Sequence, residues 1–297
     1  MKNSEVGVED ISILKQSLPY IQRFKNTTFV VKLGGEAMRD AETLAMVIED
    51  ITLLHLVGIR LVIVHGGGRH VTEMAQSLGI ESKFVGGRRI TDDKALDVLK
   101  MVLSGKISIE ILSLLKKNGV KAMGVSGVAA GVIQARKRPP VKVSGSGEEL
   151  VDFGQVGDIE RIDTELLSLL LEKGYVPVLS PLGADTDGNV LNINADTVAS
   201  HVASELHAEK LLYLTGAPGV MADLADPTTL ISRLNAEEAR QAISEGIIRG
   251  GMIPKVEESL RSIARGTNQV HILSAIEPHQ MLLEIFTQSG AGTMIVP

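Results

Sequence analysis

At residues 27–36 the chain reads TTFVVKLGGE, a short apolar run that ends in a lysine and two glycines. Residues 61–68 repeat the arrangement as LVIVHGGG. Uninterrupted runs of Val, Ile and Leu that lead through glycine into a helical pattern are typical of parallel strands buried on both faces. The two stretches therefore predict neighbouring strand-to-helix units of an α/β fold.

The same alternation continues along the chain. Further strand-like runs lie at residues 176–179, 211–214 and 270–273. Segments with the length and period of helices lie at residues 41–56, 92–117, 163–173 and 195–206. The glycine-rich residues 141–163 and the turn signal Asp187-Gly188 break this pattern and predict hairpins on the rim of the sheet. No linker-like stretch marks a domain boundary.

Composition narrows the class of protein. The 297 residues, 44% of them hydrophobic, are enough for one large core or two moderate ones. A net charge of −6, the lack of Trp and an aromatic content of 3% argue against a nucleic-acid partner. Because Cys is absent, disulfides, thiolate nucleophiles and cysteine zinc sites are excluded. Residues 1–24 carry charges throughout, so we expect neither a secretory signal nor a membrane span, and we expect a cytoplasmic location.

The two glycine-rich turns are the first candidates for a binding site. In an open parallel sheet, ligands bind beyond the carboxyl ends of the strands, where Lys32, Gly34–Gly35 and Gly66–Gly68 lie. Glycine lets backbone N–H groups approach an anion closely, and the helix that follows adds its partial positive charge. Neither the P-loop motif nor the dinucleotide-binding G-x-G-x-x-G motif occurs. The alternative is a pair of plain turns beside a solvated lysine.

Three further segments contain polar candidates. Arg88 and Arg89 follow a Gly-Gly pair, and on a strand only one of them can face a given site, where a guanidinium suits a carboxylate. Asn192 and Asn194 share one face ahead of Asp196, which reads as a helix cap or first-turn residue. Lys255 follows a Gly-Gly turn at a helix start. The alternatives are two surface arginines and an ordinary capping aspartate.

Taken together, these segments resemble the amino acid kinase family, and in particular its members that act on N-acetyl-L-glutamate. The resemblance covers residues 27–297 and rests on V-K-L-G-G, V-H-G-G-G, G-x-R-I-T-D, N-I-N-A-D and G-G-M-x-x-K in that order. It implies a three-layer αβα sandwich around a mainly parallel open sheet. It also implies a helical arm at residues 1–26, a substrate-binding lobe at 27–194 and a nucleotide-binding lobe at 195–297.

The resemblance also implies a reaction. ATP would phosphorylate the γ-carboxylate of N-acetyl-L-glutamate to an acyl phosphate, which is the second step of arginine biosynthesis. Mg²⁺ would be carried by the nucleotide rather than by a protein metal site. Such a carboxylate has an unperturbed pKa of about 4.3 and needs no general base. The implied catalytic residues are Lys32, Lys255 and Asp196; the substrate-binding residues are Gly66, Gly67, Arg89 (rather than Arg88), Asn192 and Asn194; the nucleotide-binding residues are Gly34, Gly35, Thr215, Gly216 and Gly219.

Regulation is implied by the same resemblance. Residues 18–24 look like the arm of arginine-inhibited hexamers, in which such helices interlace dimers into a trimer of dimers. The alternative is a helix packed on its own domain. A PII-type regulator is a further partner that the resemblance allows. The implied arginine effector residues are Tyr20, His271, Glu284, Gly290 and Gly292.

Two departures from the family pattern bear on nucleotide and substrate choice. Gly216 stands where relatives have Asp, and residues 126–131 read SGVAAG instead of a sequence that begins S-G-K-D-G. Two other functions stay open at this stage. One is a sister kinase for another acylated amino acid, such as a carrier-linked aminoadipate or glutamate. The other is a non-catalytic arginine-sensing homologue, which would have no need for both lysines and the aspartate.

Overall fold

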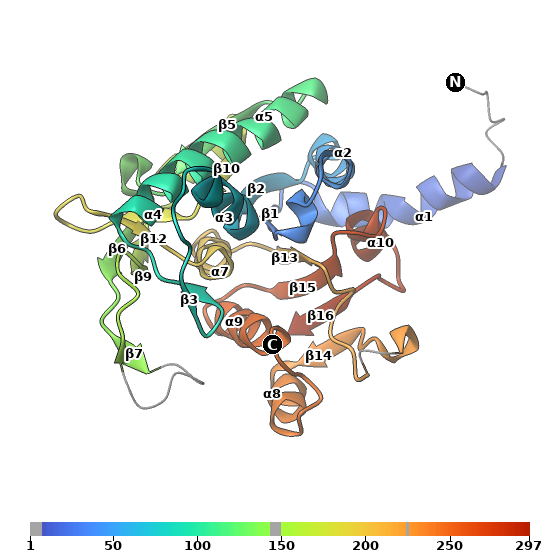
Figure 1. Ribbon diagram of the computed structural model, residues 1–297. Helices are drawn as coiled ribbons and strands as arrows, with labels where there is room; N and C mark the ends of the chain where they lie inside the picture. The colour runs from blue at the N-terminus through green and yellow to red at the C-terminus, as the bar shows by residue number, and fades with distance from the viewer. Residues whose placement is uncertain (1–7, 143–149, 224–225) are drawn as a thin grey trace.

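The computed structural model describes residues 8–142, 150–223 and 226–297. Its centre is one eight-stranded sheet (Figure 1). Neighbouring strands from β5 to β15 run parallel, whereas β16 runs antiparallel to β15. In spatial order the strands are β14 (Arg233–Asn235), β16 (Thr293–Val296), β15 (Gln269–Ser274), β13 (Lys210–Thr215), β1 (Thr28–Leu33), β2 (Arg60–His65), β10 (Val176–Ser180) and β5 (Ala122–Ser126).

Helices cover both faces of this sheet, which confirms the three-layer αβα arrangement. The alternation along β1 assigns the faces: Phe29, Val31 and Leu33 pack into one apolar core, and Val30 packs into the other. The first core is closed by α2 (Ala41–Leu56), α3 (Gly68–Ser77), α4 (Asp93–Leu99), α5 (Ser108–Lys117) and α10 (Gln280–Phe286). The second is closed by α6 (Glu165–Glu172), α7 (Ala195–Glu205), α8 (Ala236–Ser244) and α9 (Met252–Ala264).

The predicted helix at residues 92–117 is helical throughout but not uniform. It begins at α4, where the Asp92 side chain accepts a hydrogen bond from the N–H of Ala95. Between α4 and α5, the segment η2 (Lys100–Ile107) is a π-helix. Short 3-10 helices occur at η1 (Glu36–Met38), η3 (Ala129–Gly131) and η4 (Pro227–Thr229). The first glycine turn therefore leads into η1 before α2 begins.

The expectation that the hairpins decorate the rim of the main sheet is wrong. They build a separate four-stranded sheet in the order β12 (Val190–Asn192), β11 (Leu182–Ala184), β6 (Ile133–Lys137) and β9 (Gly157–Ile162). The predicted turn at Asp187-Gly188 does join β11 to β12. Two small hairpins pair β3 (Phe84–Val85) with β4 (Arg88–Arg89), and β7 (Val141–Lys142) with β8 (Leu150–Val151). Residues 143–149, within the predicted hairpin region, lie outside the described residues.

The N-terminal arm is the helix α1 (Val8–Phe24), and Pro19 does not interrupt it. At its end, Phe24 is buried and meets the ring of Phe29 edge-on, with 5.4 Å between centroids. Tyr20 also packs against the core of the same chain. Within the described ranges no helix is long and apolar enough to cross a bilayer. The main sheet continues from β1 to β13 across residue 194, so the proposed lobes share one sheet.

Candidate functional site

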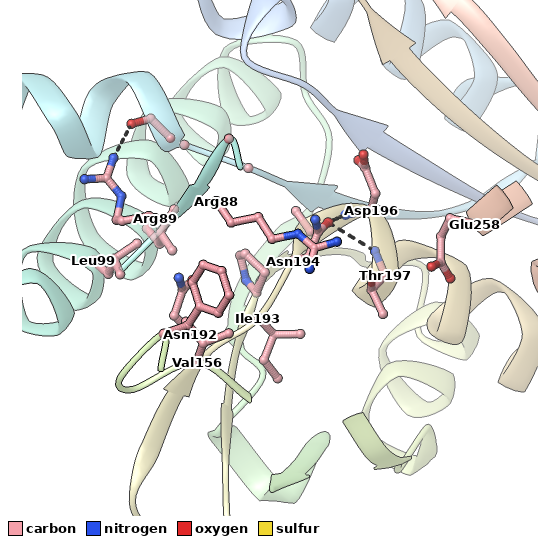
Figure 2. A pocket seen from close by; sticks show the side chains of 18 of the residues that line it. Arg88, Arg89, Leu99, Val156, Asn192, Ile193, Asn194, Asp196, Thr197 and Glu258 are labelled. Carbon is pink, nitrogen blue, oxygen red and sulfur yellow. Dashed lines mark hydrogen bonds between the residues drawn. The ribbon is translucent and has the colours of Figure 1, made fainter. Parts of the chain in front are cut away.

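A cavity of about 730 Å³ opens beyond the carboxyl ends of β1 and β2. Its walls also include the hairpin β3–β4, strand β12 and the first turn of α7 (Figure 2). Most of the candidate catalytic and substrate-binding residues line it, but Lys255 does not, and neither does Gly34, a candidate nucleotide-binding residue. Its lining includes Lys32, Gly35, Gly66, Gly67, Arg88, Arg89, Asn192, Asn194 and Asp196.

Two lysines converge on one carboxylate at the edge of this cavity. The Nζ of Lys32 lies 2.5 Å from Oδ1 of Asp196, and the Nζ of Lys255 lies 2.8 Å from Oδ2. Lys32 is buried. The two ammonium groups, 223 positions apart in the numbering (255 − 32), are thus held by opposite oxygens of a single side chain.

Burial and charge act against each other in this cluster. Burial alone would raise the pKa of Asp196, but Lys32 and Lys255 outweigh it and hold that pKa at about 2. Burial lowers the pKa of Lys32, and the charge of Asp196 opposes the shift. Asp196 is therefore ionised at neutral pH, and its charge favours the ammonium form of Lys32.

Local structure explains why the three groups meet. Lys32 shares its strand face with Val30, the face that α7 covers. Asn194 caps α7 by accepting hydrogen bonds from the N–H groups of Asp196 and Thr197, so Asp196 is a first-turn residue and not the cap. The buried Tyr213 fixes that turn, because its hydroxyl donates to the backbone oxygen of Asp196 at 3.0 Å.

Helix α9 is held against α7 by a second polar network. Glu258, one turn beyond Lys255, is buried and pairs with Arg261 at 3.0 Å and with Arg265 at 3.1 Å. Arg265 also donates to the hydroxyl of Ser200 on α7 at 2.6 Å. Since this bridge joins the two helices that supply Asp196 and Lys255, it fixes the spacing of the lysine and the carboxylate.

The glycines divide into two groups. The N–H of Gly34 donates to Leu214 and the N–H of Gly66 donates to Leu33, so the expectation that these two N–H groups contact substrate or phosphate is wrong. Gly34 serves a close approach instead: a Cβ there would lie 2.5 Å from the backbone oxygen of Leu214. In the described part of the chain, the N–H groups of Gly35 and Gly67 make no hydrogen bond and remain available to an anion.

The two arginines of the hairpin have different environments. Arg89 donates to the hydroxyls of Ser82 and Thr72, each at 2.6 Å, and to the backbone oxygen of Gly68 at 3.0 Å. Its guanidinium also stacks on the ring of Phe84, 4.7 Å from the centroid. Figure 2 shows Arg88 extending the other way, into the cavity. The two side chains point in opposite directions, as predicted for a strand, although both arginines line the same cavity.

The two asparagines also have structural partners. Asn192 donates from its side-chain amide to the hydroxyl of Thr91 at 3.2 Å, which ties β12 to the end of the arginine hairpin. The side-chain oxygen of Asn194 is occupied by capping α7, so only its amide N–H groups remain for a ligand. Both asparagines line the cavity, and each places side-chain amide N–H donors on its wall.

The candidate nucleotide residues after β13 lie outside this cavity lining. The hydroxyl of Thr215 donates to the backbone oxygen of Ala217 and accepts from its N–H, both at 3.0 Å. A Cβ at Gly216 would lie 2.9 Å from the side chain of Glu36, and one at Gly219 would lie 2.6 Å from the hydroxyl of Thr293. Because β13 neighbours β1, these turns are beside the lysine cluster at the same edge of the sheet.

A second buried cluster lies at the opposite edge. The Nδ1 of His271 donates to Glu284 at 2.6 Å, and its Nε2 lies 2.9 Å from the Nζ of Lys210. The other Glu284 oxygen accepts from the N–H groups of Ala291, at 2.6 Å, and Gly292, at 3.0 Å. A Cβ at Gly290 would lie 2.7 Å from that oxygen. Tyr20 packs against the first apolar core, and its helix α1 contacts α10, the helix that carries Glu284.

Lys210 is a member of this cluster that sequence analysis missed. It is buried at the start of β13, and burial lowers its pKa to about 8. Glu284 has a pKa of about 2, because its hydrogen bond with His271 and two backbone N–H groups outweigh the effect of burial. A lysine at the start of an apolar strand gives no local signal, since its partners come from β15 and α10.

Comparisons with known proteins find similarity over nearly the whole chain. The model of the amino acid kinase family matches residues 27–274. The chain is 44% identical over 293 residues to the acetylglutamate kinase of Carboxydothermus hydrogenoformans, a match that covers 99% of this chain and 100% of that relative. Similarity also extends to the acetylglutamate kinase of Methanocaldococcus jannaschii, at 45% identity over 97% of this chain and 96% of the relative.

A solved structure has a similar fold. The N-acetylglutamate synthase of Neisseria gonorrhoeae, complexed with coenzyme A and N-acetyl-glutamate, gives a TM-score of 0.81 at 27% identity. The match covers 97% of this chain but only 63% of the synthase. The same synthase complexed with coenzyme A and L-arginine gives a TM-score of 0.78 at 26% identity, covering 96% of this chain and 65% of that chain.

Proposed function

The chain belongs to the amino acid kinase family, and we propose that it transfers the γ-phosphoryl group of ATP to the γ-carboxylate of N-acetyl-L-glutamate. It is a phosphotransferase, and the product would be N-acetyl-L-glutamyl 5-phosphate, an intermediate of arginine biosynthesis. The observation that carries the proposal is the pairing of Lys32 and Lys255 with Asp196 at the edge of the cavity. The choice of N-acetyl-L-glutamate as the substrate rests on the relatives named acetylglutamate kinase, which match over nearly their full length.

The reaction asks little covalent chemistry of the protein. One oxygen of the γ-carboxylate attacks the γ-phosphorus of ATP, and the bond to the bridging oxygen breaks as ADP leaves. Lys32 and Lys255 offset the negative charge on the oxygens of the migrating group. Asp196 favours the charged form of Lys32 and fixes the positions of both lysines, and the free N–H groups of Gly35 and Gly67 add donors. No proton has to be removed from the nucleophile.

The substrate would extend from these lysines toward the hairpin β3–β4. Its α-carboxylate would meet the arginine side, where Arg89 is the residue that the family resemblance assigns and Asn192 assists. Phe153 and Val156 supply apolar lining for the acetyl group. This arrangement separates the two carboxylates of the substrate, so only the γ-carboxylate reaches the transferring phosphoryl group.

ATP would lie across the carboxyl ends of β13 and β1, with Thr215, Gly216 and Gly219 in the turn beneath it. We assign Mg²⁺ to the nucleotide phosphates. Both oxygens of Asp196 are paired with lysines, and the described residues contain no group of three or more His, Asp or Glu side chains that could hold a metal. In this proposal the protein contributes ammonium groups and N–H donors, and the nucleotide carries the metal.

One assay tests this function against its alternatives. Release of ADP is measured with N-acetylglutamate, free glutamate, aspartate and N-acetylaminoadipate, and hydroxylamine traps any acyl phosphate as a hydroxamate. Turnover with N-acetylglutamate alone is the expected result. Preference for N-acetylaminoadipate would instead indicate the sister kinase, and turnover with none of the four would leave the arginine-sensing homologue.

Arginine inhibition is a second proposal. The buried Glu284, His271 and Lys210 form a charged cluster that the phosphoryl-transfer chemistry does not use, and a relative with a similar fold is known in complex with L-arginine. The ratio of activity with and without arginine is compared between the wild type and Glu284→Gln; a variant as sensitive as the wild type would contradict the proposal. The hexamer, the PII-type regulator and the cytoplasmic location also stay predictions.

A further inference from the structure

His65 is the last residue of β2, and its side chain is fully buried without lining the cavity. It pairs in register with Leu33, so it faces the first apolar core. Its Nδ1 lies 3.0 Å from the backbone oxygen of Gly66. Because a carbonyl oxygen can only accept, Nδ1 carries the proton and donates. In the described part of the chain no backbone N–H is paired with that oxygen, so the imidazole is the group that holds it.

The other ring nitrogen of His65 has no partner. Nε2 is buried and makes no hydrogen bond with the described residues. Burial lowers the pKa of His65 to about 4, so the ring is neutral at pH 7 and Nε2 is an unprotonated acceptor. A buried acceptor without a donor costs free energy, and an apolar side chain of similar volume would avoid that cost. Packing alone therefore does not account for a histidine at this position.

The hydrogen bond from Nδ1 holds a peptide group whose other side belongs to the cavity. The oxygen of Gly66 and the N–H of Gly67 are parts of one trans peptide, so they point in opposite directions. Gly67 lines the cavity, and its N–H has no partner among the described residues. A peptide between two glycines has wide conformational freedom and needs an anchor to keep one orientation. If this peptide turned over, it would present an oxygen instead of a donor to an anion.

We propose that His65 is a positioning residue, which fixes the Gly66–Gly67 peptide so that the N–H of Gly67 faces the migrating phosphoryl group. The inference rests on the proposed function. A donor that is already oriented stabilises negative charge without having to reorganise during the reaction. Donation to the oxygen of Gly66 also polarises the peptide, which strengthens its N–H as a donor. The ring itself does not line the cavity, so it acts only through the peptide.

The experiment compares His65→Leu with His65→Asn. Leucine has a volume similar to that of histidine but has no donor, whereas the smaller asparagine can place its amide nitrogen where Nδ1 lies. For His65→Leu we expect kcat to fall about 10- to 100-fold, with KM for ATP and for N-acetyl-L-glutamate within about threefold, because an oxyanion donor is misplaced. For His65→Asn we expect kcat within about threefold of the wild type. Its thermal midpoint should nevertheless lie below that of His65→Leu, because the smaller side chain leaves a space. Activity and stability then rank in opposite order, which a purely structural role would not produce.

The matched control is His55→Leu, which removes an imidazole with an unpartnered Nδ1 from α2, outside the cavity lining, and should leave kcat unchanged. An unchanged kcat in His65→Leu would overturn the proposal. Equal losses of kcat in both His65 variants would do the same, since the fit of the ring and not its donor would then matter.

Crystal structures of the two His65 variants test the same point without turnover. The Gly66–Gly67 peptide should keep its orientation in His65→Asn and lose it in His65→Leu, and an unaltered peptide in His65→Leu would contradict the role given to the ring. Lack of turnover by the wild type with N-acetyl-L-glutamate would refute the proposed function separately, because the orientation of the peptide is measured without catalysis.

Discussion

The two edges of the central sheet carry clusters of similar charged groups. The clusters differ in whether the hydrogen-bond donors around them have partners. At the carboxyl edge, Asp196 holds two lysines beside a cavity that also contains N–H groups and an arginine with no partner among the described residues. At the amino edge, both oxygens of Glu284 are saturated by His271 and two backbone N–H groups. The comparison shows that charge alone does not mark a reactive site; donors left without partners beside a cavity do.

Removing a lysine from the first cluster should have the largest effect. Lys255→Met should lower kcat about 100-fold or more, because a group that offsets charge on the migrating phosphoryl group is lost. Steady-state kinetics with N-acetylglutamate and ATP measure the change. Lys94→Met, at an exposed position, is the matched control. A change in KM with kcat preserved would contradict the role given to Lys255.

A smaller effect is expected in the second cluster, and on stability. Glu284→Gln should lower the free energy of unfolding by about 2–3 kcal/mol, because the charged acceptor of a buried histidine and two N–H groups is replaced. Urea unfolding at pH 7 measures the loss. An unchanged midpoint would show that the saturated cluster contributes little to folding, and the contrast between the two edges would fail.

The close approach of β1 and β13 gives a third prediction. Gly34→Ala should destabilise the protein by about 2 kcal/mol, because the added Cβ would meet the backbone oxygen of Leu214. Gly35→Ala is the matched control, since nothing lies within 4 Å of a Cβ there. Thermal unfolding of the two variants separates a packing requirement at Gly34 from a destabilising effect of alanine anywhere in this turn. Equal stability of the two variants would contradict the packing requirement.

The smallest effect is the pH dependence that both clusters share. Asp196 and Glu284 have pKa values of about 2 in the folded chain, below about 4 in the unfolded chain. Their stabilising contribution is present above pH 4 and is lost as pH falls toward 2, because the unfolded chain takes up the protons first. Glu284→Gln should reduce the fall between pH 5 and pH 3 by on the order of 1 kcal/mol. An identical fall in wild type and variant would contradict this account.

Much of the fold followed from local pattern. Strand β1 and helix α2 lie where predicted because continuous Val, Ile and Leu runs and a capping aspartate leave few alternatives. The π-helix η2 and the second sheet were not predicted, because both depend on how distant segments pack. The five strand-like runs all belong to the central sheet.

The candidate site was predictable to a different degree. Lys32, Lys255 and Asp196 meet as the motif resemblance implied. The N–H groups of Gly34 and Gly66, however, are occupied by hydrogen bonds to the backbone of neighbouring strands, and a motif does not specify that pairing. The hydrogen bonds that occupy Arg89 come from α3 and the preceding loop, so the different availability of the two arginines emerges only in three dimensions.

Strand β13 has Lys210 at one end and Thr215 at the other, and it is hydrogen-bonded to a parallel neighbour on each side. A strand bonded on both sides cannot slide along its axis without breaking two ladders at once, and a shift of one residue would turn every side chain to the opposite face. A change at Lys210, such as the binding of a ligand, therefore cannot move Thr215 by shifting β13 along its axis. It must change the twist of the sheet or the tilt of the helices that rest on it.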